Sequence, residues 1–316
     1  MERRIATVFG ASGFIGRHLV RRLAAAGYAV RAAVRDADQA LFLKPMGDVG
    51  QIVPWPADIT RRDTVDAAVA GADVVVNLVG ILYERGRATF DAVHAKGAGN
   101  VAEAAAAAGV PHLVHVSALG ADANSPARYA RSKAAGEAAV TAAFKKATIL
   151  RPSVVFGPED DFFNRFAGMA RLSPVLPVIG GGEGPKFQPV YVGDVADAVM
   201  AALADPKAQG QTFELGGPAV YSFRGLMKLI MAQTGRKRCL LPVPLWLAEI
   251  QGAVLGLLPK PPLTLDQVQL LKSDNVVSDK AKTFKHLGLS PRAAEAVLPT
   301  YLLRFKENAW QGVQSV

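Results

Sequence analysis

Residues 5–16 of the chain read IATVFGASGFIG, a short apolar run followed by three glycines spaced three residues apart. The run Ile5–Phe9 has the length and composition of a β-strand. Glycines at 10, 13 and 16 let the chain turn sharply and let backbone amides approach a pyrophosphate, and a helix that begins here offers the anion its N-terminus. We therefore predict a dinucleotide-binding loop whose contact residues are Gly10, Ser12, Gly13, Phe14, Ile15 and Gly16.

Alternating strands and helices follow this loop through the first half of the chain. The expected strands are continuous apolar runs, which indicates strands buried on both faces of a parallel sheet. We therefore predict an α/β protein with a doubly wound parallel-sheet Rossmann fold. The expected strands are Ile5–Gly10, Ala29–Arg35, Asp73–Leu78, His112–Ser117, Thr148–Phe156 and Thr212–Leu215, and the expected helices are Gly16–Ala26, Thr64–Ala70, Ala98–Ala108, Ala127–Phe144 and Asp194–Ala204.

The pattern changes after Phe156, where turn residues multiply and prolines interrupt the helical stretches. We predict that residues 1–156 form the dinucleotide-binding Rossmann core, to which elements around residues 188–216 return. Residues 157–187 and 217–316 are expected to form a smaller, mostly C-terminal α/β domain that contacts a partner or a substrate.

Composition excludes several classes of protein. Half of the 316 residues are hydrophobic (50%) and 20% are charged, which is typical of a globular chain and excludes an intrinsically disordered one. The single cysteine, Cys239, can form neither an internal disulfide nor a cysteine metal site, and we predict no bound metal. A net charge of +9 without a nucleic-acid motif predicts no nucleic-acid partner. We expect neither a signal peptide nor a membrane-spanning helix.

The end of the second expected strand indicates which dinucleotide binds. An NAD-specific site places a carboxylate at this tip, where it bonds the adenosine ribose. Here the tip is Val34, followed by Arg35 and only then by Asp36. Arg17, just after the third glycine, can face the same ribose. Two guanidinium groups suit a 2′-phosphate, so we predict NADP(H), held by Arg17 and Arg35.

Two further segments end at the expected edge of the sheet. Asp58 can accept a hydrogen bond from the adenine amino group while Ile59 packs on the ring, although an aspartate before a helix also serves as an N-cap. Leu78, Val79 and Gly80 end another strand, and a glycine there permits close approach to a ribose. We include all five residues in the expected cofactor site.

A serine, a tyrosine and a lysine form the candidate reactive group. Tyr129 and Lys133 lie four residues apart and share a helix face, and Ser117 ends the strand just upstream. An ammonium near the phenol favours tyrosinate, so Tyr129 can exchange a proton with a carbonyl or hydroxyl that Ser117 holds. Lys133 can also hold the nicotinamide ribose. The three residues act either as catalytic groups or as groups that only bind.

These residues resemble the extended and atypical branch of the short-chain dehydrogenase/reductase superfamily over about residues 1–220. The resemblance implies a Rossmann domain and a smaller domain that closes over the nicotinamide. The segment Arg151–Gly157 is similar to the family's sixth strand, whose backbone flanks the nicotinamide, so Pro152 and Val155 join the expected cofactor site.

A narrower resemblance spans nearly the whole chain. Similarity to the nucleotide-binding accessory subunits of respiratory complex I is carried by Val93-His94, Pro152–Phe166, Gln188–Val195, Pro262–Val268 and Asp274–Val277. His94 stands where most extended enzymes look to have an asparagine. The resemblance implies tight NADP(H) binding without turnover, other complex I subunits as partners, and a place near the membrane and the quinone region.

Two functions follow from these expectations. The first is a peripheral accessory subunit of a bacterial complex I at the cytoplasmic side of the inner membrane. The second is a free NADPH-dependent reductase or epimerase that uses Ser117, Tyr129 and Lys133. The helix expected over Leu245–Leu258 is apolar nearly all round and too short to span a bilayer. It is either core or a surface that docks at the membrane.

Overall fold

The computed structural model describes residues 3–181 and 184–306. Within them the chain divides into two compact units. The first unit comprises residues 3–152, 192–215 and 278–290, and the second comprises residues 153–181, 184–191, 216–277 and 291–306.

A seven-stranded sheet with the order β11-β6-β5-β4-β1-β2-β3 forms the centre of the first unit. All of its neighbouring strands are parallel, which confirms the predicted doubly wound α/β fold. The order reverses between β1 and β4, and open sheets of this kind bind ligands at the carboxyl edge beside that point. The strands are β1 (Ile5–Phe9), β2 (Ala29–Val34), β3 (Ile52–Pro56), β4 (Val74–Asn77), β5 (His112–Val116), β6 (Thr148–Pro152) and β11 (Thr212–Leu215).

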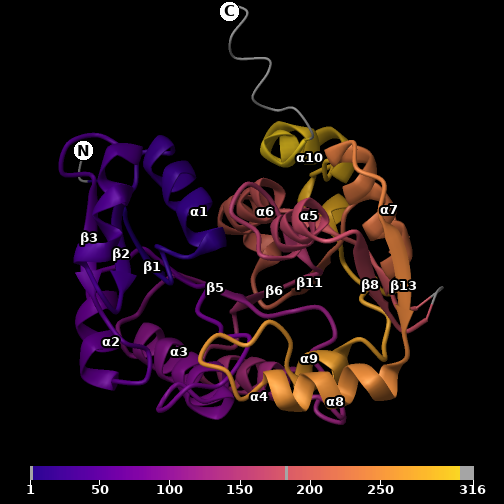
Figure 1. The fold of residues 1–316 in the computed structure, drawn as a ribbon. Helices are drawn as coiled ribbons and strands as arrows, with labels where there is room; N and C mark the ends of the chain where they lie inside the picture. The colour runs from indigo at the N-terminus through magenta and orange to yellow at the C-terminus, as the bar shows by residue number, and fades with distance from the viewer. Residues whose placement is uncertain (1–2, 182–183, 307–316) are drawn as a thin grey trace, which may run out of the picture. The chain divides into compact units, whose positions relative to one another are not determined.

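Helices cover both faces of this sheet (Figure 1). On one face α1 (Phe14–Ala25) packs against α6 (Val192–Ala204), and Arg22 Nε lies 2.6 Å from Asp197 Oδ1 between them. The other face is covered by α2 (Arg62–Val69), α3 (Gly97–Ala107) and α4 (Arg128–Ala143). Segments of other helix types are η1 (Asp38–Met46), η2 (Asp91–Lys96), η3 (Pro206–Ala208) and η4 (Phe284–Leu287).

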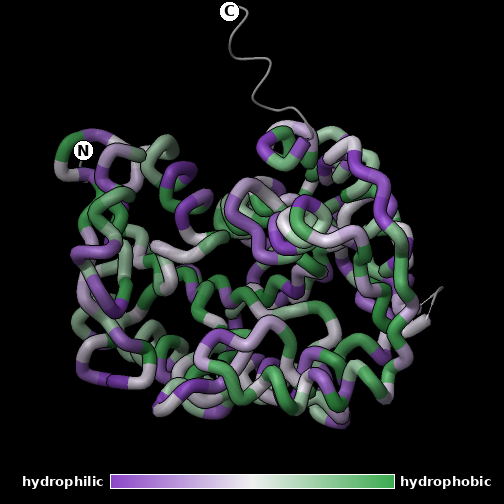
Figure 2. Tube along the Cα trace, in the orientation of Figure 1, coloured by the Kyte–Doolittle hydropathy of each residue, from purple (hydrophilic) through white to green (hydrophobic). Residues whose placement is uncertain are grey.

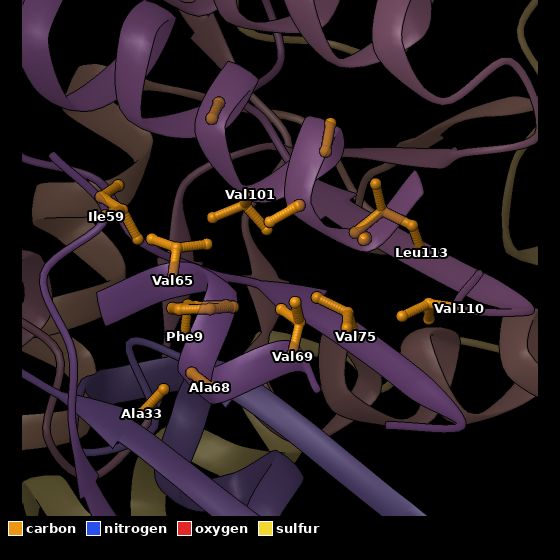
Figure 3. Close-up of a cluster of buried hydrophobic side chains, with 14 of the residues drawn as sticks. Phe9, Ala33, Ile59, Val65, Ala68, Val69, Val75, Val101, Val110 and Leu113 are labelled. Carbon is orange, nitrogen blue, oxygen red and sulfur yellow. The ribbon is translucent and has the colours of Figure 1, made fainter. Parts of the chain in front are cut away.

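One core cluster of the first unit lies between the sheet and the layer of α2, α3 and α4. Figure 3 shows Phe9 and Val75 of the strands facing Val65, Val69 and Val101 of α2 and α3. All five are nearly or completely buried. Because strands β1 and β4 are apolar on both faces, they are covered from both sides, as the continuous apolar runs predicted.

The strand expected over Thr148–Phe156 is interrupted, so that prediction is wrong in its extent. β6 ends at Pro152, and β7 (Val155–Phe156) belongs to the second unit, where it pairs with β10 (Val190–Tyr191). Proline has no N–H with which to continue a ladder. The next two residues turn to a side chain instead, because Ser153 Oγ and Val154 N donate to Asn275 Oδ1 at 2.6 and 3.2 Å.

The second unit consists of short strand pairs and helices. β8 (Val175–Ile179) pairs with β13 (Cys239–Val243), and β9 (Lys186–Phe187) pairs with β12 (Tyr221–Ser222). Its core contains Phe156, Phe163, Phe223 and Leu298. The helices are α5 (Phe162–Leu172), α7 (Phe223–Thr234), α8 (Leu245–Leu255), α9 (Leu265–Leu270), α10 (Ala294–Leu302) and the single turn η5 (Leu303–Phe305).

The helix expected over Leu245–Leu258 is shorter than predicted. α8 ends at Leu255, and Gly256 closes its last turn by donating from its amide to Gly252 O at 3.0 Å. Pro259 follows and cannot continue a helix. Across the part of the chain that the structure describes, each helix is too short or too polar to cross a membrane.

Candidate nucleotide site

The glycine loop connects β1 to α1 and has the shape that a phosphate requires. Gly10 adopts a φ of +79°, a left-handed conformation that favours glycine. A Cβ at Gly16 would collide with the carbonyl oxygen of Gly10, so the loop closes tightly on the helix start. No side chain among the described residues caps the first turn of α1, which leaves its amides available for an anion. The loop therefore fits the pyrophosphate of a dinucleotide.

Positive charge lies at the tip of β2. Val34 is buried, Arg35 is exposed, and the Asp36 carboxylate accepts hydrogen bonds from the amides of Asp38 and Gln39 at 3.1 and 3.2 Å. Asp36 caps the start of η1 in this way. Arg35 and Asp36 are both exposed at this tip, and the contact of Arg35 with an adenosine ribose stays a prediction.

Arg17 is held close to the glycine loop. Its guanidinium donates to the carbonyl of Ser12 at 3.2 Å and lies 5.1 Å from the centre of the Phe42 ring. Phe42 is on η1, so loop, helix and turn together fix the side chain. The Arg17 guanidinium thus lies beside the glycine loop, and its contact with a 2′-phosphate stays a prediction.

Asp58 and Ile59 follow β3, and both have contacts within the protein. Asp58 Oδ1 accepts from the amide and the hydroxyl of Thr60 at 2.9 and 2.8 Å, which is a local turn and not the N-cap of α2, since that helix begins at Arg62. Ile59 is 4% exposed and packs in the core of the first unit. Their contacts with adenine stay predictions.

The segment after β4 is fixed by two buried polar side chains. Asn77 Oδ1 accepts from the amide of Val79 at 3.1 Å, and His94 Nε2 accepts from the amide of Ile81 at 2.9 Å. Gly80 lies between these two bonds and is exposed. Leu78, Val79 and Gly80 are thus held at the carboxyl edge next to the glycine loop. Pro152 ends β6 in the first unit, whereas Val155 belongs to the second unit.

Ser117, Tyr129 and Lys133 all lie in the first unit, after β5 and on the first turns of α4. Ser117 Oγ is buried and has no hydrogen-bond partner among the described residues. A buried hydroxyl without a partner is costly, and a ligand oxygen would satisfy it. Lys133 is 4% exposed and donates from Nζ to the carbonyl of Val116 at 3.0 Å. The residues fit the nicotinamide end of a dinucleotide.

Burial shifts the pKa of Lys133. Removal from water lowers the pKa of its ammonium to about 8, and the nearby Glu137 carboxylate opposes that shift. Arg151 engages the same carboxylate through two bonds of 2.9 and 2.6 Å and lies 3.6 Å from Glu214. Lys133 is therefore mostly charged at pH 7, but its pKa lies much closer to neutral pH than the pKa of an exposed lysine does. A group with such a perturbed pKa marks a candidate reactive site.

His94 lies at the site although it is not among the residues predicted to contact the cofactor. The sequence singles it out only because most extended enzymes have an asparagine at this position. It lies on the π-helical turn η2, and such turns are frequent at functional sites. Its ring stacks on Phe90 and meets the Tyr129 ring edge-on, with centroids 5.3 Å from the latter. The spacing of single residues gives no signal for this contact, because it joins positions 35 residues apart.

The hydrogen bonds of His94 determine its tautomer. Since the Ile81 amide can only donate, Nε2 accepts, and Nδ1 carries the proton toward Ser132 Oγ at 2.8 Å. The Ser132 hydroxyl in turn donates to the carbonyl of Tyr129 at 2.7 Å. Burial and the Lys133 charge lower the pKa of His94 to about 3, so the ring is neutral. This series of hydrogen bonds connects the segment after β4 to the turn of α4 that carries Tyr129.

No group of three His, Cys, Asp or Glu side chains in the described residues could hold a metal ion. His115 is buried among the same elements and bonds Asn77 Nδ2 at 3.3 Å, and its pKa is lowered well below the usual value by desolvation.

Comparison with protein families identifies the first two thirds of the chain. The NAD dependent epimerase/dehydratase family matches residues 6–216. The matched region begins in β1 and ends just after β11, so it covers the whole of the central sheet. The family supports a nicotinamide dinucleotide as the cofactor.

Relatives that match almost the whole chain are subunits of complex I. The chain is 39% identical to the mitochondrial NADH dehydrogenase [ubiquinone] 1 alpha subcomplex subunit 9 of Arabidopsis thaliana over 96% of this chain and 78% of that protein. It is 36% identical to the mouse subunit of the same name over 97% of this chain and 81% of that one. A ceramide reductase of Caulobacter vibrioides is 35% identical over 65% of this chain and 62% of the reductase.

Solved structures of sugar-nucleotide enzymes share the fold. The UDP-glucose 4-epimerase of Thermotoga maritima superposes with a TM-score of 0.72 at 18% identity, over 98% of this chain and all of the epimerase. The enzyme of the same name from Thermus thermophilus, solved with NAD, gives a TM-score of 0.69 at 21% identity over 95% of this chain and 98% of that one. The family match over residues 6–216 and the relatives show that the chain belongs to the NAD dependent epimerase/dehydratase family and is homologous to the complex I subunits named above.

Proposed function

We propose that the protein is an NADP(H)-binding accessory subunit of a membrane-bound complex I, without turnover of its own. The observation that carries this proposal is sequence identity of 39% and 36% to two complex I subunits over nearly the entire chain, second unit included. Family membership alone would account only for residues 6–216. The proposed place is the peripheral arm near the quinone and membrane junction, on the cytoplasmic side of a bacterial inner membrane, with other complex I subunits as partners.

In this proposal the two units have different tasks. The first holds the nucleotide through the glycine loop, the segment after β4 and Lys133, and the second contacts partner subunits. The choice of NADP(H) over NAD(H) is supported by exposed Arg35 at the tip of β2 and by the engagement of Asp36 in capping η1. Bound nucleotide would then act as a structural element that supports the shape of the first unit.

Isolation of the native protein tests this function directly. The tagged full-length protein is purified from its own membranes after mild detergent extraction, and nucleotide is released and analysed. We expect stoichiometric complex I subunits in the eluate and a nucleotide that carries a 2′-phosphate. A Tyr129→Phe strain should assemble the complex and retain NADH:quinone activity. Recovery of the protein without complex I subunits would contradict the proposal.

A second function is favoured by one specific observation, the complete Ser117, Tyr129 and Lys133 group. When bound, NADPH would supply a hydride to a carbonyl carbon. Ser117 Oγ, which has no hydrogen-bond partner in the described part of the chain, would hold the carbonyl oxygen, and Tyr129 would give it a proton with the Lys133 ammonium close by. The chain would then be an NADPH-dependent short-chain-type reductase or epimerase.

The substrate class of such an enzyme can be proposed from two relatives. One is named a ceramide reductase, and another, from Shewanella oneidensis and 29% identical over 79% of this chain, is named a 2-alkyl-3-oxoalkanoate reductase. Both names describe lipids, so a long-chain ketone is the substrate to test. NADPH oxidation that depends on such a ketone and is abolished by Tyr129→Phe would favour the enzyme over the accessory subunit.

A further inference from the structure

α8 exposes three of its large apolar side chains on one face, while Leu245 and Leu247 are half-buried against a small core cluster. Trp246, Ile250 and Val254 follow each other at intervals of four residues and are 62%, 55% and 62% exposed. Ala248 and Gly252, on the opposite face, are buried. A helix on the surface of a globular protein normally does the reverse, since burial of large apolar groups is what stabilises its packing.

The buried face of α8 is committed to a contact within the second unit. A Cβ at Gly252 would lie 2.9 Å from the amide nitrogen of Leu265 and the carbonyl carbon of Thr264, so the helix approaches the start of α9 backbone to backbone. Ala248 joins Val268 and Val243 in a small core cluster. Leu245 and Leu247 pack against the same cluster. These contacts fix the orientation of α8 and leave Trp246, Ile250 and Val254 exposed.

The exposed apolar surface continues beyond the helix. Leu257 and Leu258 follow α8 and are 87% and 48% exposed, and Figure 2 shows that hydrophobic residues dominate this part of the chain. We define the α8 surface as the set Trp246, Ile250, Val254, Leu257 and Leu258. Single exposed apolar residues are ordinary, whereas five within thirteen positions of one element and its extension mark an interaction site.

Charge around this surface is sparse and sums to zero between Cys239 and Leu265. From Cys239 to Leu265 the chain carries only two charged residues, Glu249 and Lys260. Glu249 is neutralised by Lys272, whose Nζ lies 2.6 Å from its carboxylate, and this partner holds the pKa of Glu249 below its usual value. Lys260 follows the surface and is exposed. The pattern suits an anionic headgroup layer, which attracts lysines at the edge of an apolar surface.

We propose that the α8 surface inserts into the interface of an anionic phospholipid bilayer. At eleven residues, and a rise of about 1.5 Å per residue, α8 has the length of a helix that lies in the interface rather than spanning the bilayer. Tryptophan is typical of that layer. A protein partner would call for hydrogen-bonding groups, about one per 100–200 Å² of interface, and the side chains of the α8 surface offer only the Trp246 indole. This deepens the peripheral membrane contact of the proposed function and names its residues.

Vesicle binding by the purified full-length protein tests the proposal. The protein is floated with vesicles of phosphatidylcholine alone or of equal parts phosphatidylcholine and phosphatidylglycerol. We expect wild type to float with the anionic vesicles, and the triple variant Trp246→Ser, Ile250→Ser, Val254→Ser to bind them at least about tenfold more weakly. Lys260→Gln should reduce the preference for anionic vesicles by about fivefold.

A matched control keeps the loss specific. The control is a second triple variant, in which Val49→Ser, Leu82→Ser and Leu172→Ser are combined. It removes three apolar side chains outside α8 that are 105%, 55% and 87% exposed, and it should bind vesicles as wild type does. If the triple variant misfolds, quenching of Trp246 fluorescence by brominated lipid, measured against Trp246→Phe, reports insertion in the otherwise unaltered chain. Brominated lipid should quench wild type and leave the Trp246→Phe signal unchanged.

Three results would overturn the proposal: no flotation of wild type, equal flotation of the triple variant, or no quenching of Trp246. If the α8 surface binds a protein partner instead, wild type will not float with vesicles but will still be recovered with complex I subunits. If the proposed function is wrong, the protein can still bind vesicles, but complex I subunits will not copurify with it. The two failures are therefore distinguishable.

Discussion

Arg35 is exposed at the tip of β2, and the Asp36 carboxylate beside it accepts hydrogen bonds from the first amides of η1. We expect Arg35→Glu to weaken NADP(H) binding by about 10- to 100-fold, since a charge-assisted bond to a phosphate contributes about 1.5–3 kcal/mol. Binding of NAD(H), which has no 2′-phosphate, should change little. Isothermal titration of both nucleotides on nucleotide-free protein measures the difference.

Arg21→Glu is the matched control for this charge reversal. Arg21 is exposed on α1, and the variant has the same net charge as Arg35→Glu. It should bind NADP(H) as wild type does. Equal weakening in both variants would mean that only the overall field matters, and an unchanged affinity in Arg35→Glu would remove Arg35 from the site.

His94 makes stability depend on pH. Its folded-state pKa of about 3 lies below the usual value of 6.5, so folding favours the neutral ring. The stabilisation is complete above pH 6.5 and is lost as the pH falls from 6.5 toward 3, by up to about 1.4 kcal/mol per pH unit. The His94→Gln variant cannot titrate there, and its free energy of unfolding should fall less steeply with acid. Denaturant unfolding at several pH values gives both slopes.

His115 supplies an internal check on that experiment. Its pKa is also lowered by burial, so the double variant His94→Gln, His115→Gln should be flatter again between pH 6.5 and 5. A single variant whose slope equals that of wild type would show that folding does not lower the pKa of His94. It would also contradict the tautomer that the Ile81 and Ser132 bonds assign.

At the scale of elements, two glycines on neighbouring helices predict opposite outcomes. A Cβ at Gly136 of α4 would collide with the carbonyl oxygen of His94, whereas a Cβ at Gly99 of α3 would meet only Ala139 Cβ at an ordinary 3.5 Å. Gly136→Ala should destabilise the protein by about 2–3 kcal/mol through overpacking. Gly99→Ala should be neutral or stabilise it by up to about 1 kcal/mol through helix propensity. Thermal and denaturant unfolding compare the pair.

Nucleotide binding separates a local from a global effect in this pair. Because Gly136 sets the approach of α4 to η2, Gly136→Ala should also weaken NADP(H) binding, while Gly99→Ala should not. A stable Gly136→Ala variant with normal binding would show that α4 and η2 can move apart without consequence for the site.

Sequence patterns predicted the elements well where local composition decides them. Continuous apolar runs predicted the central strands, and glycine spacing predicted the loop at residues 10–16, because both signals lie in neighbouring residues. The division of the expected strand at Pro152 depends on Asn275, 122 positions from Ser153, so nothing near residue 152 besides the proline predicts it. The early end of α8 had a nearer signal in Gly256 and Pro259 that the apolar run concealed.

At the scale of the whole molecule, the chain passes between its two units five times, at residues 152, 191, 215, 277 and 290. The sequence predicted the return of residues near 188–216, since a helix and a strand are evident there. The contribution of residues 278–290 to the first unit was not anticipated. That segment is attached through long-range bonds, such as that from the Glu214 amide to the Lys282 carbonyl at 2.8 Å, which composition does not reveal.

The nucleotide is expected to stabilise the molecule that holds it. A ligand that binds only the folded state at a hundredfold excess over its Kd adds about 2.7 kcal/mol, which corresponds to roughly 5–11 °C in Tm for units of 150–250 residues. Stripping the nucleotide should therefore lower the Tm, and NADPH should restore it more than NADH does. Arg35→Glu should lose the difference between the two nucleotides but keep the smaller shift. Gly13→Asp, which places a carboxylate where the loop faces the pyrophosphate, should lose both shifts. A stripped wild type whose Tm does not respond to NADPH would contradict the nucleotide-holding role itself, whatever the protein's partners are.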